Sequence, residues 1–135
     1  MQALSSSPIR ILGWNCQGIC NASTMQALGA LIRAQCPDVV FLCETKADDS
    51  RMRKIVNLFG FQEFIAIGPK GRADGVCMFW SSTIVAKVLE FNFNMVAITI
   101  KDSHYVWSLI GFYGPPLQEQ TQKGLDKSSR AFRID

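Results

Sequence analysis

Two short apolar segments separated by one amphipathic stretch constrain the fold of this chain more than any other feature. Residues 9–14 and 38–43 are mostly apolar and of strand length, as expected for strands buried in a sheet. Between them, apolar side chains recur at helical spacing, Ser23 and Gln26 stand at capping-box spacing, and Pro37 ends the helix. This strand, helix, strand order predicts an α/β fold.

The chain beyond this unit predicts one more helix and then strands. The second helix lies between about 50 and 60, with N-cap candidates at 48–50 and Gly60 suited to a left-handed C-terminal cap. Strand-like segments then follow at 61–67, 76–80, 84–91, 95–100 and 105–112. Only short turn-rich pieces separate them, which predicts a run of antiparallel hairpins.

The length of 135 residues fits one domain with one core. We expect a disordered N-terminus over 1–8, a folded region over 9–116 and a polar tail over 117–135. A hydrophobic content of 48% against 19% charged residues is enough to fill such a core. The net charge of +3 is spread along the chain, so any contact with phosphate would be local rather than through a broad basic surface.

The cysteines predict free thiols in a reducing compartment, because their number is odd and none forms a Cys-x-x-Cys pair. They are Cys16, Cys20, Cys36, Cys43 and Cys77. The single histidine, His104, completes no zinc pattern with them and lies in a predicted surface turn. We find no secretory signal pattern and no apolar run of the ~18–20 residues that a membrane helix needs. We therefore expect an intracellular protein, nuclear or cytosolic.

Polar residues follow two of the predicted strands at the point where each strand ends. Asn15 and Glu44 both stand at the carboxyl end of an apolar segment, the rim where open α/β sheets bind ligands. If the two strands are neighbours, a carboxylate and an amide converge there, which suits a hard cation whose shell is completed by phosphate oxygens. A capping or turn role for both residues is the alternative, and their position alone does not decide.

Tyr113 is a third candidate, at the end of a later strand and before a turn. Its phenol could donate a hydrogen bond to a phosphate oxygen or stabilise a leaving oxyanion, whereas packing at the edge of the core is the alternative role. The thiols have no base near them in sequence, so a cysteine nucleophile is not indicated. We expect the tryptophans to pack the core; they are Trp14, Trp80 and Trp107.

Four segments together resemble one known family. They are 11–18 (ILGWNCQG), 37–46 (PDVVFLCETK), 71–80 (GRADGVCMFW) and 112–115 (FYGP). The chain resembles the endonuclease/exonuclease/phosphatase superfamily, of deoxyribonuclease I-like fold, and within it the endonuclease domains of plant non-long-terminal-repeat (LINE-type) retrotransposons. The specific feature is the pair W-N-x-x-G and P-D-x-x-x-L-x-E-T-K on either side of one helix, and the resemblance covers about 9–116.

The resemblance implies a four-layer α/β/β/α sandwich and metal-dependent hydrolysis of a phosphodiester or phosphomonoester, with DNA as partner. The family's metal-ligating glutamate falls on Glu44, and its asparagine, which helps to hold phosphate and metal, falls on Asn15. The tyrosine beside the scissile phosphate falls on Tyr113. The implied cofactor is Mg²⁺, with Mn²⁺ as an alternative. One departure is that Asp74-Gly75 stands where the retrotransposon relatives usually carry Gly-Gly.

A larger departure lies downstream of Tyr113, where the family's G-D-x-N and S-D-H segments have no counterpart in the sequence. We therefore expect a partial sandwich, roughly one sheet with two helices. The inner face of a lone sheet would be exposed, and a few hundred Å² of apolar surface at ~25 cal/mol per Å² amounts to several kcal/mol of missing burial. Such a chain should be marginally stable, self-associate through that face or depend on a partner.

The function expected from the resemblance is that of a retrotransposon-derived, Mg²⁺-dependent nuclease domain. Because the downstream segments position the attacking water and complete the acid and base groups in relatives, we expect this truncated chain to be weak or inactive in isolation. Two alternatives remain open at this point. One is a non-catalytic remnant or interaction module, and the other is a phosphomonoesterase of the same superfamily.

Overall fold

The computed structural model describes residues 8–103, 105–114 and 129–134 as two helices and two four-stranded sheets. The helices are α1 (Ala22–Gln35) and α2 (Asp49–Leu58). The first sheet has the order β1-β2-β4-β3, with β1 (Ile11–Asn15), β2 (Val39–Cys43), β3 (Glu63–Ile67) and β4 (Val76–Trp80). The second has the order β5-β6-β7-β8, with β5 (Val85–Asn92), β6 (Met95–Lys101), β7 (Val106–Tyr113) and β8 (Ser129–Ile134).

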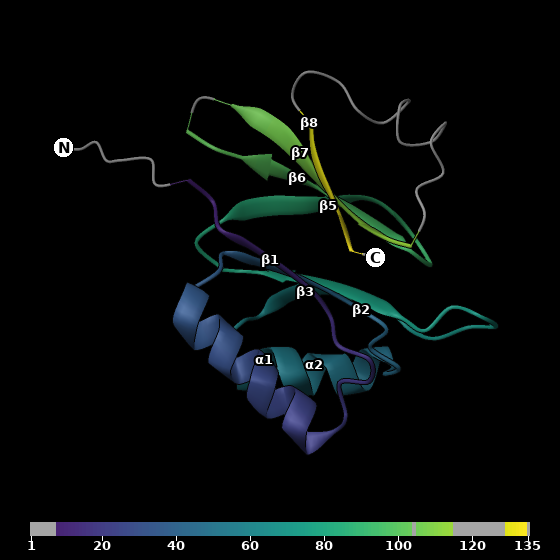
Figure 1. Ribbon diagram of the computed structural model, residues 1–135. Coiled ribbons are helices and arrows are strands. Elements are labelled where there is room, and N and C mark those ends of the chain that lie inside the picture. Colours follow the sequence, from purple (N-terminus) through teal and green to yellow (C-terminus); the bar gives the residue numbers. More distant parts are fainter. Residues whose placement is uncertain (1–7, 104, 115–128, 135) are drawn as a thin grey trace.

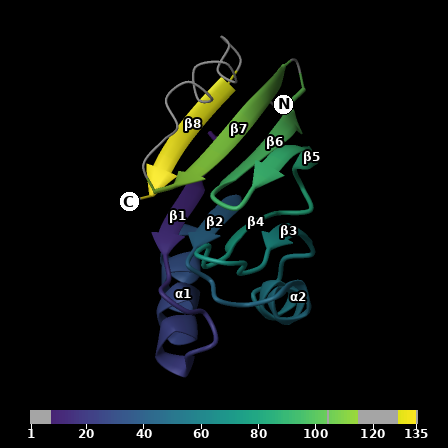
Figure 2. The same ribbon diagram turned by 90° about the vertical axis from the view of Figure 1, so that its right-hand side faces the viewer.

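The described part of the chain is arranged in three layers (Figure 1). The two helices cover the outer face of the first sheet, and the second sheet lies on its inner face. Figure 2 shows the second sheet stacked on the first with β8 on the side of β1 and β5 on the side of β3. The predicted α/β class and partial deoxyribonuclease I-like sandwich are confirmed. No helix in this part of the chain is long and apolar enough to cross a membrane.

The strand pairing agrees with the predicted element order. β1 and β2 are parallel neighbours, as a strand, helix, strand unit requires, and β4 pairs antiparallel with both β2 and β3. In the second sheet, β5, β6 and β7 form two successive antiparallel pairs, so the expected hairpins are present. β8 then pairs parallel with β7.

Side-chain caps determine where the helices begin. The side chain of Asn21 accepts hydrogen bonds from both the backbone nitrogen (2.8 Å) and the hydroxyl (2.7 Å) of Ser23, so the N-cap of α1 lies two residues before Ser23 of the predicted capping box. At its other end Cys36 adopts a left-handed conformation immediately before the predicted stop. α2 begins after Asp48, whose carboxylate accepts from the backbone nitrogen of Arg51 at 2.8 Å.

The apolar side chains divide into two cores. The core between the helices and the first sheet is built by fully buried residues of β2, β4 and both helices, among them Val40, Leu42, Phe79, Leu28 and Met52. The core between the two sheets is built from the opposite faces of the same strands and from β6 and β7, and it includes Phe41, Met78, Trp80, Ile98 and Leu109. Because β2 and β4 carry apolar side chains on both faces, each serves both cores.

The expectation of roughly one sheet with an exposed inner face is therefore corrected. Phe41 on the inner face of β2 packs against the second sheet, where Gly111 leaves just enough room: a Cβ atom at Gly111 would lie 2.9 Å from the Phe41 ring. The sequence pattern predicts the hairpins correctly, but a hairpin has the same sequence pattern whichever sheet it joins. The inner face is buried, so self-association through it is not available.

The expected polar tail over 117–135 also needs correction, because 129–134 form strand β8. Phe132 and Ile134 of this strand face the sandwich, and the Phe132 ring meets the Phe41 ring edge-on with centroids 5.6 Å apart. These two apolar side chains alternate with polar ones, a period-two pattern that is too short to identify a strand without its neighbour β7. Residues 1–7 of the expected disordered N-terminus and residues 117–128 and 135 of the expected polar tail lie outside the described residues.

Candidate active site

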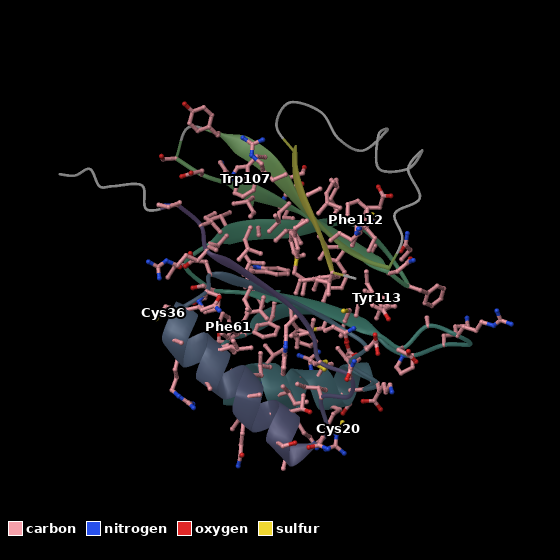
Figure 3. All side chains as sticks on the ribbon, viewed as in Figure 1. Cys20, Cys36, Phe61, Trp107, Phe112 and Tyr113 are labelled. Carbon is pink, nitrogen blue, oxygen red and sulfur yellow. The ribbon has the colours of Figure 1, made fainter. Side chains whose placement is uncertain are left out.

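The three predicted site residues lie at one rim of the sandwich. Asn15 is the last residue of β1 and pairs in register with Cys43, so Glu44 follows at the adjacent end of β2. Tyr113 is the last residue of β7, on the other sheet, where its backbone nitrogen donates to the carbonyl of Asn94 at 2.8 Å. Figure 3 shows Tyr113 in the layer between the two sheets. The ends of β1, β2 and β7, which are separate in the sequence, thus lie close together in the fold.

The carboxylate of Glu44 joins the other two side chains. Its Oε2 atom accepts a hydrogen bond from Nδ2 of Asn15 at 2.7 Å and another from the hydroxyl of Tyr113 at 2.5 Å. Its Oε1 atom receives neither of these bonds and, among the described residues, has no donor. Glu44 is half-buried, so one carboxylate oxygen is fixed by protein and the other remains available at the rim.

These hydrogen bonds shift the pKa values of Glu44 and Tyr113 in opposite directions. The hydrogen bonds from Tyr113 and then Asn15 lower the pKa of Glu44, assisted by the positive charge of Lys46. The same bond to the carboxylate, followed by burial, raises the pKa of Tyr113 to about 12. At neutral pH the site therefore holds an ionised carboxylate and a protonated phenol that can only donate to it.

The backbone around Glu44 is unusual, because three non-glycine residues of the rim adopt positive φ angles. These are Gln17 (50°), Glu44 (54°) and Lys46 (53°). Left-handed conformations of such residues cost free energy and occur where the surrounding structure holds them, often at functional sites. Here the tight turn after β2 directs the Glu44 side chain toward Asn15 and Tyr113 rather than along the strand.

The histidine and the cysteines singled out in the sequence take no part in the contact of Asn15, Glu44 and Tyr113 that the structure describes. His104 lies outside the described residues. Burial raises the pKa of the Cys16 thiol to about 11 and that of the Cys43 thiol to about 12, and it raises the pKa of Cys77 as well. All five cysteines are free. The thiols of Cys16, Cys43 and Cys77 are thus protonated at neutral pH, which disfavours a nucleophilic role for these three.

The oxygen atoms of the side chains at the rim suit a hard cation whose other ligands are water and phosphate. Within the residues described, no group of three or more His, Cys, Asp or Glu side chains lies together. Mg²⁺, however, is commonly held by one or two carboxylates while water and substrate phosphates complete its shell. The ionised Glu44 fits that pattern through its available Oε1. Asn15 fits it through its Oδ1 atom, an amide oxygen with two lone pairs that accepts, among the described residues, one hydrogen bond from the backbone nitrogen of Gln17.

Sequence reasoning missed the residues that shape the turn. Thr45, directly after Glu44, is fully buried, and Gly75 contacts it from the connection between β3 and β4. The available signal was the run of turn residues that contains Gly75, which marks a special backbone position but not the residue that it faces.

Comparison with known proteins agrees with this geometry. The sequence profile described as the Endonuclease/Exonuclease/phosphatase family matches residues 12–119. The chain belongs to this family. The resemblance to the endonuclease/exonuclease/phosphatase superfamily inferred from the sequence motifs is thereby confirmed. A comparison with curated protein sequences finds no match for this family member.

Several solved structures share the fold of this member of the endonuclease/exonuclease/phosphatase family. The endonuclease domain of TRAS1, a telomere-specific non-LTR retrotransposon, superposes with a TM-score of 0.60 at 12% identity, covering 93% of this chain and 58% of that one. An AP endonuclease from Archaeoglobus fulgidus gives 0.64 at 19% identity, with 93% and 56% covered. D. rerio TDP2 complexed with a single-strand DNA product gives 0.62 at 15% identity, with 93% and 58% covered. The chain thus spans little more than half the length of these structures, and at such identities the likeness shows the fold alone.

Proposed function

We propose that this chain is a nuclease-type domain of the endonuclease/exonuclease/phosphatase family that hydrolyses phosphodiester bonds of nucleic acid with the help of a divalent cation. The observation that carries the proposal is the contact of Asn15, Glu44 and Tyr113, because one carboxylate oxygen receives both donors and the other is left for a cation. The family in general depends on divalent metal. The roles of Asn15, Glu44 and Tyr113 in this reaction are predictions.

Glu44 and Asn15 are the residues that would hold the cation, Mg²⁺ or alternatively Mn²⁺. When bound, a divalent cation neutralises charge on the phosphate oxygens during phosphodiester hydrolysis. The amide of Asn15 fixes the orientation of the Glu44 carboxylate through its Nδ2 atom, while its Oδ1 atom accepts from the backbone nitrogen of Gln17 at 3.2 Å. The carboxylate is thereby held in one orientation before substrate arrives.

Tyr113 would contribute a hydrogen bond to the substrate. Its raised pKa keeps the phenol protonated throughout the physiological range, so its single hydroxyl proton, which Glu44 accepts here, would turn to a phosphate oxygen bound beside Glu44. Tyr113 lies on the second sheet, so its hydroxyl reaches the Glu44 carboxylate from the other side of the sandwich. A phosphate at the rim would then contact both sheets of the sandwich.

The proposal of nucleic acid as substrate is supported by the solved neighbours, which include a retrotransposon endonuclease domain and a DNA product complex. We further propose a retrotransposon origin, on the basis of the motifs around Asn15 and Glu44. The proposed activity of the isolated chain is slow, because the sequence after Tyr113 contains no Asp-x-Asn segment and no histidine to position or activate water.

The test is nicking of supercoiled plasmid by the purified chain in molar excess, with Mg²⁺, with Mn²⁺ and with chelator. We expect slow, metal-dependent nicking that falls by about 10²-fold or more in Glu44→Gln. Glu90→Gln, the same change on the exposed strand β5, is the matched control and should keep the wild-type rate.

Absence of nicking by the folded protein with either cation, or equal rates for wild type and Glu44→Gln, would refute the proposed function. Rapid multiple turnover would refute the slow rate but not the chemistry. A phosphomonoester hydrolysed faster than DNA in the same buffers would instead support the phosphomonoesterase alternative.

A further inference from the structure

The residue that follows Glu44 is a buried polar residue. Thr45 is fully buried, with 0% of its surface exposed, and within the described part of the chain its Oγ1 atom has no hydrogen-bond partner. Buried hydroxyl groups in native proteins nearly always have a partner, and leaving one without costs about 1–3 kcal/mol. An apolar side chain would avoid that cost, so hydrogen bonding does not explain this threonine.

The shape of Thr45 explains it better, because the side chain packs directly against Gly75. A Cβ atom at Gly75 would lie 2.5 Å from Oγ1 of Thr45 and 3.4 Å from the carbonyl oxygen of Ile67, and real Cβ atoms essentially never come as close as the first of these. Gly75 also has a φ of +95°, which side chains rarely adopt. The contact therefore requires glycine at position 75.

Backbone hydrogen bonds connect this contact to the Glu44 turn on both sides. On one side, the backbone nitrogens of Thr45 and Lys46 donate to the carbonyls of Gly75 (3.2 Å) and Asp74 (2.7 Å). On the other, the carbonyl of Glu44 accepts from Gly18 at 2.7 Å and that of Thr45 from Ile19 at 3.0 Å. The turn that carries the carboxylate is thus held between the β1–α1 loop and the segment before β4.

We propose that Thr45 and Gly75 are positioning residues, whose tight packing holds Glu44 in its left-handed conformation and so keeps its carboxylate against Asn15 and Tyr113. This deepens the proposed function and rests on it for its catalytic meaning. The two side chains touch neither substrate nor cation in the proposal. They act only by fixing where the Glu44 carboxylate points.

Gly75→Ala tests the contact, and Gly71→Ala is its matched control. Both glycines lie in the β3–β4 connection with positive φ angles, but a Cβ atom at Gly71 would meet nothing within 4 Å. Both variants therefore carry a left-handed alanine, and only Gly75→Ala pushes on Thr45. We expect Gly75→Ala to reduce plasmid nicking by on the order of 10²-fold, as displacements of about 1 Å do, and Gly71→Ala to stay within about twofold of wild type.

Adding Thr45→Ala to Gly75→Ala gives the decisive comparison. Removal of the threonine side chain clears the 2.5 Å overlap, so the double variant should recover most of the activity lost in Gly75→Ala. A double variant as impaired as Gly75→Ala would overturn the proposal. If Gly75→Ala fails to fold, Thr45→Ala alone tests the same point, because loss of the packing should loosen the turn.

A readout independent of catalysis separates this proposal from the proposed function. In ¹H–¹⁵N spectra, the side-chain NH₂ signals of Asn15 report its hydrogen bond to Glu44, and Glu44→Gln gives the signature of a changed partner. We expect Gly75→Ala and Thr45→Ala to displace these signals and Gly71→Ala to leave them in place. Unchanged Asn15 signals in both variants would overturn the positioning role, even if the chain proves to be a nuclease. Displaced signals in a chain without nicking would uphold the role and refute the nuclease.

Discussion

Tyr113→Phe removes one hydroxyl and with it the hydrogen bond that joins the two sheets at Glu44. A hydrogen bond to a charged group contributes about 1.5–3 kcal/mol when both groups are removed from water. Glu44 and Tyr113 are only partly buried, so water can replace part of that contribution. We therefore expect the free energy of unfolding to fall by about 1–2 kcal/mol, which corresponds to a decrease in Tm of roughly 3–8 °C for a domain of this size.

The pH dependence of this loss identifies its cause. The pKa of Tyr113 rises from an ordinary value near 10 to about 12, so its stabilisation is complete below pH 10 and disappears as the pH rises through about 12. The pKa of Glu44 is lowered, so its contribution is complete above an ordinary value near 4.5 and is lost as the pH falls through the lowered value. The difference between wild type and Tyr113→Phe should be largest between about pH 4.5 and pH 10.

Urea unfolding of both proteins across this range, followed by tryptophan fluorescence, measures the difference. Tyr105→Phe is the matched control, because Tyr105 is 70% exposed and lies at the opposite end of β7, so this variant should unfold within about 0.5 kcal/mol of wild type. If Tyr113→Phe behaves like Tyr105→Phe, or if its loss of stability is the same at every pH, the hydrogen bond to an ionised carboxylate is not the source of the effect.

Two further predictions concern β8 and the thiols. Phe132→Ala should lower the free energy of unfolding by about 2 kcal/mol, less than for a fully buried Phe, while Leu58→Ala on the exposed face of α2 changes it little; equal effects in urea titrations would mean that β8 is not part of the sandwich. With a thiol reagent at pH 8, the exposed Cys20 and Cys36 should react rapidly and the other three only after unfolding, so a count of five fast thiols in the native protein would contradict the burial of the rim cysteines.

The sequence predicted the first half of the site better than the second. Asn15 and Glu44 end two apolar segments separated by one helix, an order that favours parallel strands with both ends at the same rim, and the structure shows that the two strands are neighbours. Tyr113 ends a strand of the other sheet, 69 residues from Glu44, and no local pattern specifies which rim it reaches. Only the family resemblance assigned Tyr113 to the site, beside the scissile phosphate, and its contact with the Glu44 carboxylate came from the structure.

Element positions were predicted well, whereas their assembly was not. Alternation and turn residues predicted the strands within a few residues, because these signals are local. The division into two sheets depends on Phe41 and Gly111 packing against each other across the core, which is a property of paired surfaces rather than of either segment. β8 was missed for the same reason, since Phe132 and Ile134 gain their burial only from partners far away in sequence.

The hydrogen bond between Tyr113 and Glu44 depends on how closely the two sheets pack together. Asn15 and Glu44 can meet as soon as the strand–helix–strand unit has folded, but the phenol arrives only when β7 is seated on the first sheet. Any loosening between the sheets separates donor from acceptor before it disturbs either sheet internally. The complete contact of Asn15, Glu44 and Tyr113 therefore forms late in folding, and it should be the first feature lost when the domain begins to unfold.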